Sequence, residues 1–244
     1  MTSPNQIKPM LNRLKRRLLW HLVVHNRQEA EQALYSCLIH EKALEDWTAD
    51  LPLRRPLDFS HFAGLFNDTK LSQGVVLQPI RQAAYLFGSL RSRQPGRVLE
   101  IGRYRGGTTL LLAAAMDGHG MLYSIDNGSH ERWLFGESGK FDGMLKEKLQ
   151  SLGLSAELLV GDSSTLRPGI DAVDVLIIDG GHTYDAVKRD IETFCPLVVP
   201  GGWVFADDFF SDPRVQRAWQ DSTDPSQWRL VRRVVRMAHM ERLG

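Results

Sequence analysis

Length, composition and charge exclude several classes of protein. The chain has 244 residues, 43% of them hydrophobic, which is enough to bury one sizeable core. Its 30 Lys and Arg residues nearly balance 29 Asp and Glu residues, and this net charge of +1 argues against nucleic acid as a partner. Two cysteines far apart, Cys37 and Cys195, argue against disulfides and cysteine zinc sites. With no signal-peptide pattern and no apolar run near the roughly 18 residues that span a bilayer, we expect a cytoplasmic protein without stable membrane insertion.

Residues 1–73 are predicted to form a helical extension followed by a lid-like segment. Apolar residues recur at helical spacing from Met10 to about Trp47, and Lys15 to Arg17 make the first helix basic and amphipathic. Such a charge run is usually the solvated face of a cap or dimer helix, and contact with an anionic surface is the alternative. These helices suit capping of a site, pairing of protomers into a homo-oligomer, or both.

Strand and helix patterns alternate along residues 74–244, which indicates an α/β domain with one mostly parallel sheet. Residues 127–140 interrupt the alternation as a long polar insert of the kind that often acts as a lid. The last segment is expected to be a bent hairpin with Arg232, Arg233 and Arg236 pointing outward. The predicted strands are 98–101, 121–126, 156–163, 173–179, 203–210 and a terminal pair in 228–240; the predicted helices are 80–90, 110–116, 141–152, 184–198 and 213–220.

The stretch RVLEIGRYRGGTTLLLAAAM, residues 97–116, is typical of a buried strand, a glycine turn and a helix. Such a turn opens a helix N-terminus and lets a ligand approach the backbone, because glycine has no side chain. The spacing is E-x-G-x-x-x-G-G and not the dinucleotide G-x-G-x-x-G. Glu100, just before the turn, is a poor neighbour for pyrophosphate and a better one for a cationic cofactor.

Five consecutive predicted strands end in an acidic residue. A single acid in such a place is often a turn former, so the inference depends on the set. In doubly wound sheets the carboxyl ends of the strands hold the ligand, and an acid after the second strand, here Asp126, binds ribose hydroxyls. The set comprises Glu100, Asp126, Asp162, Asp179 and the pair Asp207 and Asp208.

The last three of these acids predict a metal site with a base beside it. Asp179, Asp207 and Asp208 follow strands that should be neighbours, and three carboxylates suit Mg²⁺ or Mn²⁺ better than zinc. His182 follows Asp179 after two glycines, and a neutral imidazole is a competent general base near pH 7. The structural alternative is a loop histidine without a role.

From about Gly74 to Asp212 the chain resembles the class I S-adenosylmethionine-dependent O-methyltransferases. The motifs that carry the resemblance are VLEIGRYRGGTTLLLA, YSID, GDSS and, most specifically, IDGGHTYDAVKRDIETFCPLVVPGGWVFADDF. The group most similar is metal-dependent and includes macrolide-sugar methyltransferases and cephalosporin-hydroxylase-like proteins. The resemblance implies a doubly wound, mostly parallel seven-stranded sheet, the Rossmann-like methyltransferase fold, over residues 74–244.

The resemblance also implies a role for each matching residue. The methionine end of S-adenosylmethionine would lie against the glycine turn, the ribose against Asp126, a divalent metal such as Mg²⁺ among the last three aspartates, and His182 would be the base. One departure is that Arg103 and Arg105 flank the turn, where they would grip a carboxylate, grip an anionic substrate or point to solvent. The implied residues are Glu100, Gly102, Gly106 and Gly107 for methionine, Asp162 and Ser163 for adenine, and Asp179, Asp207 and Asp208 for metal.

The function expected is methyl transfer to a hydroxyl of a small molecule, a sugar or another natural product. One alternative is an oxidoreductase or hydroxylase-type enzyme on the same scaffold. Against it stand the glycine spacing and the lack of a second histidine near His182 for an iron triad. The other alternative is a non-catalytic binding protein that retains the fold, although such a protein has no need of four intact site residues.

Overall fold

The computed structural model describes residue 47 and residues 50–66, 68–69, 72–73, 75–166 and 169–244. The predicted N-terminal helices, and with them the predicted homo-oligomer contact, fall on residues 1–46, outside the described part. Within the described residues no helix is long and apolar enough to cross a membrane.

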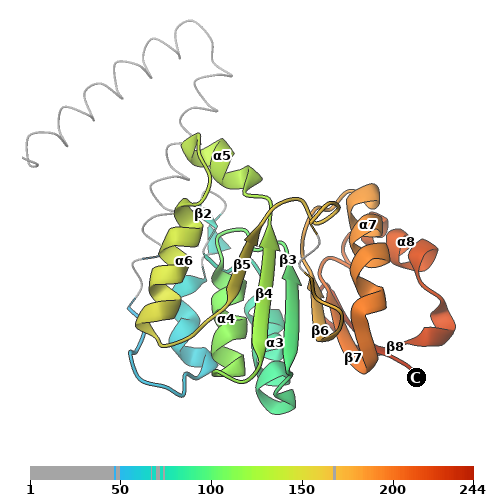
Figure 1. The fold of residues 1–244 in the computed structure, drawn as a ribbon, viewed down its shortest axis with the longest axis horizontal. Helices are drawn as coiled ribbons and strands as arrows, with labels where there is room; N and C mark the ends of the chain where they lie inside the picture. The colour runs from blue at the N-terminus through green and yellow to red at the C-terminus, as the bar shows by residue number, and fades with distance from the viewer. Residues whose placement is uncertain (1–46, 48–49, 67, 70–71, 74, 167–168) are drawn as a thin grey trace, which may run out of the picture.

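A seven-stranded sheet forms the centre of the molecule, in the order β5-β4-β3-β6-β7-β9-β8 (Figure 1). The first five strands of this order are parallel, while β9 runs antiparallel to both β7 and β8. This confirms the predicted fold class, including the terminal hairpin. The strands are β3 (Arg97–Ile101), β4 (Met121–Asp126), β5 (Glu157–Val160), β6 (Val173–Ile178), β7 (Val198–Ala206), β8 (Trp228–Val234) and β9 (Met237–Arg242).

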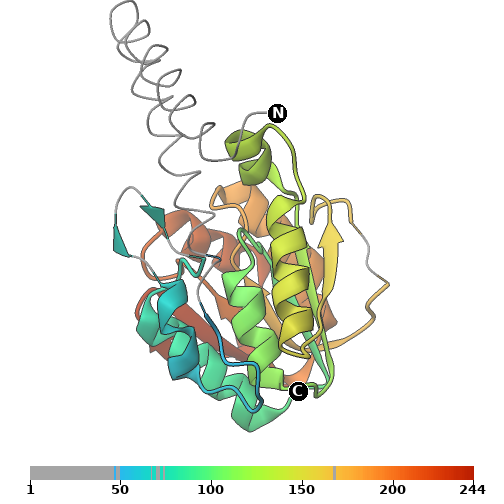
Figure 2. The ribbon, with the colours of Figure 1, turned by 90° about the vertical axis from the view of Figure 1, so that its left-hand side faces the viewer.

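Helices cover the sheet on both faces because its inner strands are apolar on both sides. In β3, Val98 packs into one buried cluster and Leu99 into the other, as expected when successive side chains alternate across a sheet. On the first face lie α3 (Ile80–Arg93), α4 (Gly107–Met116) and α6 (Lys140–Ser151), with α4 between α6 and the 3₁₀ helix η1 (Phe59–Leu65) (Figure 2). The second face carries α7 (Tyr184–Phe194) and α8 (Pro213–Ser222), which pack together.

Several element boundaries differ from the sequence-based prediction. β7 begins at Val198 and runs through Pro200 and Gly201, whereas residues 207–210 form a turn and not the end of a strand. Ile80 was expected on the inner face of its helix but is 51% exposed. The insert 127–140 contains the short helix α5 (Ser129–Phe135). Shorter elements are β1 (Asp68–Thr69), β2 (Ser72–Gln73), η2 (Cys195–Leu197) and η3 (Pro225–Gln227).

The segment before α3 takes part in the core. Leu57, Phe62 and Leu65 are buried in the same cluster as α3 and α4. The domain boundary at residue 73 stays a prediction, but η1 packs against α4 and is not merely a connection.

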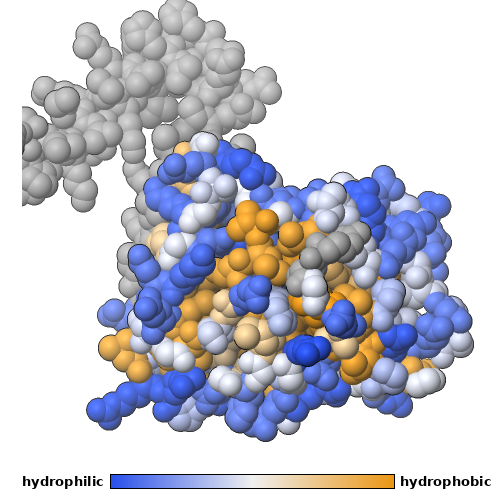
Figure 3. Space-filling model, viewed as in Figure 1, coloured by the Kyte–Doolittle hydropathy of each residue, from blue (hydrophilic) through white to orange (hydrophobic). Residues whose placement is uncertain are grey.

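The connection from β5 to β6 contains no helix in its described residues. Figure 3 shows hydrophobic side chains gathered on this face of the sheet, in front of β4 and β5. Tyr123, Leu159, Leu166 and Ile170 are only partly buried there, against the second core cluster. The carboxyl end of β5 is therefore more open than that of β3 or β6, the two strands beside the point where chain order reverses.

Candidate active site

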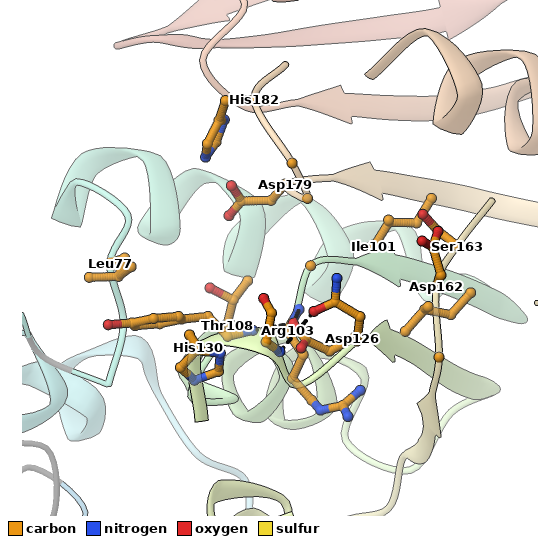
Figure 4. Close-up of a pocket in the computed structure, with 18 of the residues that line it drawn as sticks. Leu77, Ile101, Arg103, Thr108, Asp126, His130, Asp162, Ser163, Asp179 and His182 are labelled. Carbon is orange, nitrogen blue, oxygen red and sulfur yellow. Dashed lines mark hydrogen bonds between the residues drawn. The ribbon is translucent and has the colours of Figure 1, made fainter. Parts of the chain in front are cut away.

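A cavity of about 320 Å³ lies at the carboxyl ends of β3, β4 and β6 (Figure 4). Backbone hydrogen bonds hold these ends together: Gly102 N–H donates to the Ile125 carbonyl, and Asp179 N–H donates to the Ile101 carbonyl. The topological switch point of an open parallel sheet, where neighbouring connections leave in opposite directions, is where such folds bind ligands. Of the predicted site residues, the cavity is lined by Gly102, Asp126, Asp162, Ser163, Asp179 and His182.

Asp126 organises the loop at the floor of the cavity. One carboxylate oxygen accepts hydrogen bonds from the backbone N–H groups of Arg103 and Tyr104, both at 2.9 Å. The other accepts from the Gly128 N–H at 2.6 Å. A carboxylate has about four lone-pair sites, so this arrangement fixes the orientation of Asp126 and leaves acceptor capacity toward the cavity.

The glycines of the turn are required by contacts within the protein. Gly102 has φ +91°, and an added Cβ would lie 2.0 Å from the Asp179 carbonyl oxygen. A Cβ on Gly107 would lie 2.2 Å from the Val75 carbonyl oxygen, and one on Gly106 would strike Leu145. Only Gly102 of the three lines the cavity, so at Gly106 and Gly107 the structure shows packing and no ligand-facing surface.

Glu100 is fully buried beneath the turn and does not line the cavity. Its Oε2 accepts hydrogen bonds from the hydroxyls of Thr109 on α4 and Ser124 on β4, both at 2.5 Å. Its Oε1 has no partner among the described residues. Burial raises the pKa of this carboxyl to about 7, against the opposing effect of the two hydroxyls. Glu100 on β3 therefore links α4 to the sheet through these two hydrogen bonds.

Arg103 and Arg105 do not point to solvent, because they are only 3% and 1% exposed. The Arg103 guanidinium makes a bidentate ion pair with Asp142 of α6, at 2.8 and 2.7 Å, and donates to the Ser124 carbonyl at 2.6 Å. This residue also lines the cavity. Arg105 lies over the rings of Tyr104 and Phe141. Of the alternatives for these arginines, the solvent-facing one is wrong, and Arg103 connects β4 to α6.

His130 of α5 is a cavity residue that the sequence did not single out. Its ring lies between those of Tyr104 and Phe141, with centroids 4.3 and 5.5 Å away. Burial lowers the pKa of this imidazole to about 4, so it is neutral at pH 7. Its Nε2 is buried and has no partner among the described residues. The only signal in the sequence was its position four residues after Asp126.

Asp162 and Ser163 lie at the open end of β5. Asp162 accepts from the Ser164 N–H at 2.8 Å, and hydrogen bonds from Ser164 lower the pKa of its carboxyl. The Ser163 hydroxyl donates to Asp190 of α7 at 2.5 Å, and burial raises the pKa of Asp190 to about 6. The two residues that the resemblance assigned to adenine thus line the same cavity as Asp126.

Asp179 and Asp207 lie side by side after β6 and β7. The Asp207 N–H donates to the Ile178 carbonyl at 2.9 Å, which sets the two strand ends in register. Burial, and then the neighbouring charge of Asp207, raise the pKa of Asp179 well above its ordinary value. Gln78 donates to Asp179 at 3.1 Å and Gln82 donates to Asp207 at 2.6 Å. Asp179 faces the cavity, but Asp207 and Asp208 are not among its lining residues.

Arg236, from the turn between β8 and β9, lies against both aspartates that follow β7. Its guanidinium donates to Asp207 at 2.9 and 3.2 Å and lies 3.1 Å from an oxygen of Asp208. The other oxygen of Asp208 is 3.3 Å from Nδ1 of His182. Arg236 was expected to point outward, and that expectation is wrong: it lines the cavity instead.

The predicted metal ligands do not form a metal site as they lie. Across the part of the chain that the structure describes, no group of three His, Cys, Asp or Glu side chains is arranged to hold a metal ion. Asp207 is satisfied by Gln82 and Arg236, and a divalent ion at this place would have to displace the guanidinium. The three aspartates lie close together as predicted, but the positive charge beside them is the guanidinium of Arg236 and not a metal ion.

Comparison with known proteins identifies the class. A family model described as a methyltransferase domain matches residues 99–209. This stretch runs from β3 to the turn that holds Asp207 and Asp208, so it includes every predicted site residue. The protein is an S-adenosylmethionine-dependent methyltransferase, and S-adenosylmethionine is its methyl donor.

Solved structures share the fold at low sequence identity. The O-methyltransferase TomG from Streptomyces achromogenes is 22% identical, with a TM-score of 0.53 over 70% of this chain and 83% of that chain. An O-methyltransferase from Bacillus cereus is 18% identical, with a TM-score of 0.52 over 70% and 83% of the two chains. CalS11, a TDP-rhamnose 3'-O-methyltransferase, is 19% identical, with a TM-score of 0.52 over 64% and 78%. These likenesses establish the fold alone.

Proposed function

We propose that this methyltransferase acts on a hydroxyl group of a small molecule, a sugar or another polyhydroxylated natural product, and that His182 is its general base. The observation that carries the proposal is a single cavity with two chemically different sides. Figure 4 shows His182 on the side of the cavity away from Asp126, Asp162 and Ser163, and Arg236 and His182 both contact Asp208. Of solved structures with this fold, TomG takes part in tomaymycin synthesis and CalS11 methylates a TDP-rhamnose, which supports a small, oxygen-rich acceptor.

The first side suits the adenosyl part of the methyl donor. Asp126 keeps acceptor capacity for ribose hydroxyls, and the neutral ring of His130 lines the cavity beside it. We assign Gly102, Asp162 and Ser163 to the same ligand because they line the same cavity, and Glu100, Gly106 and Gly107 to the support of the turn. Bound S-adenosylmethionine supplies a methyl group already activated by its sulfonium, so the protein mainly aligns the acceptor and excludes water.

The second side suits removal of a proton from the acceptor. Asp208 lies at Nδ1 of His182, and an acceptor there holds the proton on Nδ1 and leaves Nε2 as the basic nitrogen. Asp179 lines the cavity on this side, where its carboxyl can hydrogen-bond a second hydroxyl of the acceptor. The predicted Mg²⁺ or other divalent cation at Asp179, Asp207 and Asp208 does not fit these residues as they lie, so no step is assigned to it.

Calorimetric titration with S-adenosylmethionine and its demethylated product tests the cofactor side. We expect binding in the micromolar range. Asp126→Ala should weaken it at least tenfold, about 1.4 kcal/mol, because the ribose acceptor and the turn geometry are lost together. Asp224→Ala removes an exposed carboxylate that only caps η3 and should leave binding unchanged. A folded wild-type protein that binds neither ligand would overturn the cofactor assignment.

Mass spectrometry of hydroxylated acceptors then tests the acceptor side. Sugars and nucleotide sugars are incubated with the methyl donor, and products are sought by the added methyl group. His182→Gln should retain donor binding and lose about 10²–10⁴-fold in transfer rate, the usual contribution of a general base. A His182→Gln variant that transfers at the wild-type rate would show that another group accepts the proton.

A further inference from the structure

We infer that Arg236 occupies the place of a divalent cation in the acceptor site, so that the acid cluster needs no metal ion. This inference rests on the proposed function, since it concerns the acceptor side of the same cavity. The acid cluster consists of Asp179, Asp207 and Asp208, which follow neighbouring strands and, taken alone, have the composition of a magnesium site. In the fold their shared neighbour is a guanidinium.

The contacts of Arg236 saturate the acid nearest the sheet. Arg236 donates to both oxygens of Asp207, at 3.2 and 2.9 Å, and Gln82 donates to one of them at 2.6 Å. The Asp207 side chain is 1% exposed, so these three nitrogen donors take the positions at which a metal ion would have to bind. A bidentate guanidinium–carboxylate pair in a buried place is among the stronger polar contacts in proteins.

The backbone brings Arg236 to this position. The residue before it, Val235, has φ +55°, and this turns the chain back between β8 and β9. The Arg236 carbonyl accepts a hydrogen bond from the Phe210 N–H at 2.8 Å, which attaches the hairpin to the turn after β7. Asp207 and Asp208 begin that same turn. Two sets of contacts therefore fix Arg236: a hydrogen bond holds its backbone to the turn after β7, and the carboxylates of that turn hold its guanidinium.

The guanidinium also has the exposure that an acceptor-site cation needs. The Arg236 side chain is 33% exposed and lines the cavity together with Asp179 and His182. Its contact with Asp208 at 3.1 Å positions the carboxylate that lies 3.3 Å from His182. One chain-borne positive charge thus offsets the aspartates, orients the base through Asp208 and faces the acceptor, which are tasks that a metal ion would otherwise combine.

Mn²⁺ alone, followed by electron paramagnetic resonance, provides a test that needs no acceptor. The full chain, saturated with the demethylated product of the donor, is titrated with Mn²⁺, and the signal of the free ion is compared with buffer. We expect no site in the wild type. One bound Mn²⁺ per chain that disappears in Asp207→Asn would overturn the inference.

Removal of the guanidinium should convert the acid cluster into a metal site. Arg236→Ala is expected to gain one Mn²⁺ site, and the double variant Arg236→Ala/Asp207→Asn should lose it again. Arg97→Ala is the matched control, because Arg97 is an exposed arginine at the opposite end of β3. A folded Arg236→Ala protein without a Mn²⁺ site would show that the acids are not arranged for a cation and would overturn the inference. If Arg236→Ala does not fold, Arg236→Gln takes its place.

The Mn²⁺ titration tests the role of Arg236 separately from the proposed function. Donor binding is measured on the same samples, so failure to bind the donor rejects the cofactor assignment independently of Mn²⁺. Donor binding together with a wild-type Mn²⁺ site rejects only the role of Arg236. Once an acceptor is found, transfer should be unchanged by a metal chelator, and loss of transfer on chelation, restored by Mg²⁺, would overturn the inference.

Discussion

The glycine turn after β3 and the acid cluster after β6 and β7 are built in different ways. The turn is local: Gly102 to Gly107 follow one strand, and Asp126 on the adjacent strand holds their backbone with hydrogen bonds of 2.9 Å. The acid cluster is assembled from distant parts of the chain. Gln82 of α3 and Arg236 of the terminal hairpin both reach Asp207, from 125 and 29 residues away.

Because of this difference, the sequence predicts the geometry of the glycine turn better than it predicts the charge of the acid cluster. In the turn, the identity of each residue is dictated by backbone contacts a few residues away in the sheet, so the motif predicts its own geometry. In the acid cluster, the charge of the site depends on a side chain outside the motif. Three carboxylates in sequence predict a metal ion, and the same three carboxylates beside an arginine do not.

Gly102→Ala should have the largest effect on the turn. The added Cβ would lie 2.0 Å from the Asp179 carbonyl oxygen at a φ of +91°, so strand ends that now touch must separate. We expect a loss of at least about 4 kcal/mol in the free energy of unfolding, measured by urea denaturation.

Gly143→Ala is the matched control for this substitution. Gly143 lies inside α6 with no atom within 4 Å of an added Cβ, so alanine should stabilise the protein by up to about 1 kcal/mol. If Gly102→Ala is within about 1 kcal/mol of the wild type, the close approach of the two strand ends is absent in solution.

Glu100→Gln should change how stability depends on pH. The pKa of Glu100 is raised from 4.5 to about 7 in the folded protein by burial, so between these pH values the folded state binds more protons than the unfolded state. The free energy of unfolding therefore falls as the pH rises through this window, by up to about 3 kcal/mol for this group.

Urea denaturation of both proteins from pH 5 to about pH 7.5 measures this dependence. Glutamine cannot ionise, and its carbonyl can still accept from Thr109 and Ser124, so the variant should show a flatter pH profile than the wild type. Parallel profiles for the two proteins would mean that Glu100 keeps an ordinary pKa in the folded state.

Asp208→Asn should produce the smallest effect, confined to the acceptor side. Asp208 lies 3.3 Å from Nδ1 of His182, a residue that is 51% exposed, so the preference for the Nδ1–H tautomer should amount to about 1 kcal/mol. Nitrogen-15 NMR of the imidazole, assigned with His182→Gln, should show this tautomer weakened in Asp208→Asn while donor binding is unchanged. An unaltered tautomer population would show that Asp208 does not control the tautomer of His182.

Much of the fold could be predicted because the relevant signals are local. The apolar strands and the helix after Gly107 follow from hydrophobic runs and turn residues, and the terminal hairpin follows from alternation after Trp228. Boundaries were less accurate where tertiary pairing overrides propensity. β7 includes Pro200 and Gly201 because β6 pairs with it at Val198 and again from Trp203 onward, and the residues between these pairs form a bulge.

The candidate site could be predicted in part for the same reason. Acids at strand ends must gather at one edge of a parallel sheet, so Asp126, Asp162 and Asp179 share a cavity as expected. His130 and Arg236 could not be found in this way. One lies in a polar insert and the other in a hairpin turn, and neither position has a spacing that distinguishes a cavity residue from a surface residue.

The sequence by itself determined the class of protein, because a strand, a glycine turn and regularly spaced strand-end acids are encoded by neighbouring residues. The tertiary structure alone decided which charges meet. It buried Arg103 against Asp142 and set Arg236 between Asp207 and Asp208. The physical reason is that hydrophobic periodicity specifies which faces pack, whereas the partner of a charged side chain depends on where the folded backbone brings a residue of opposite charge.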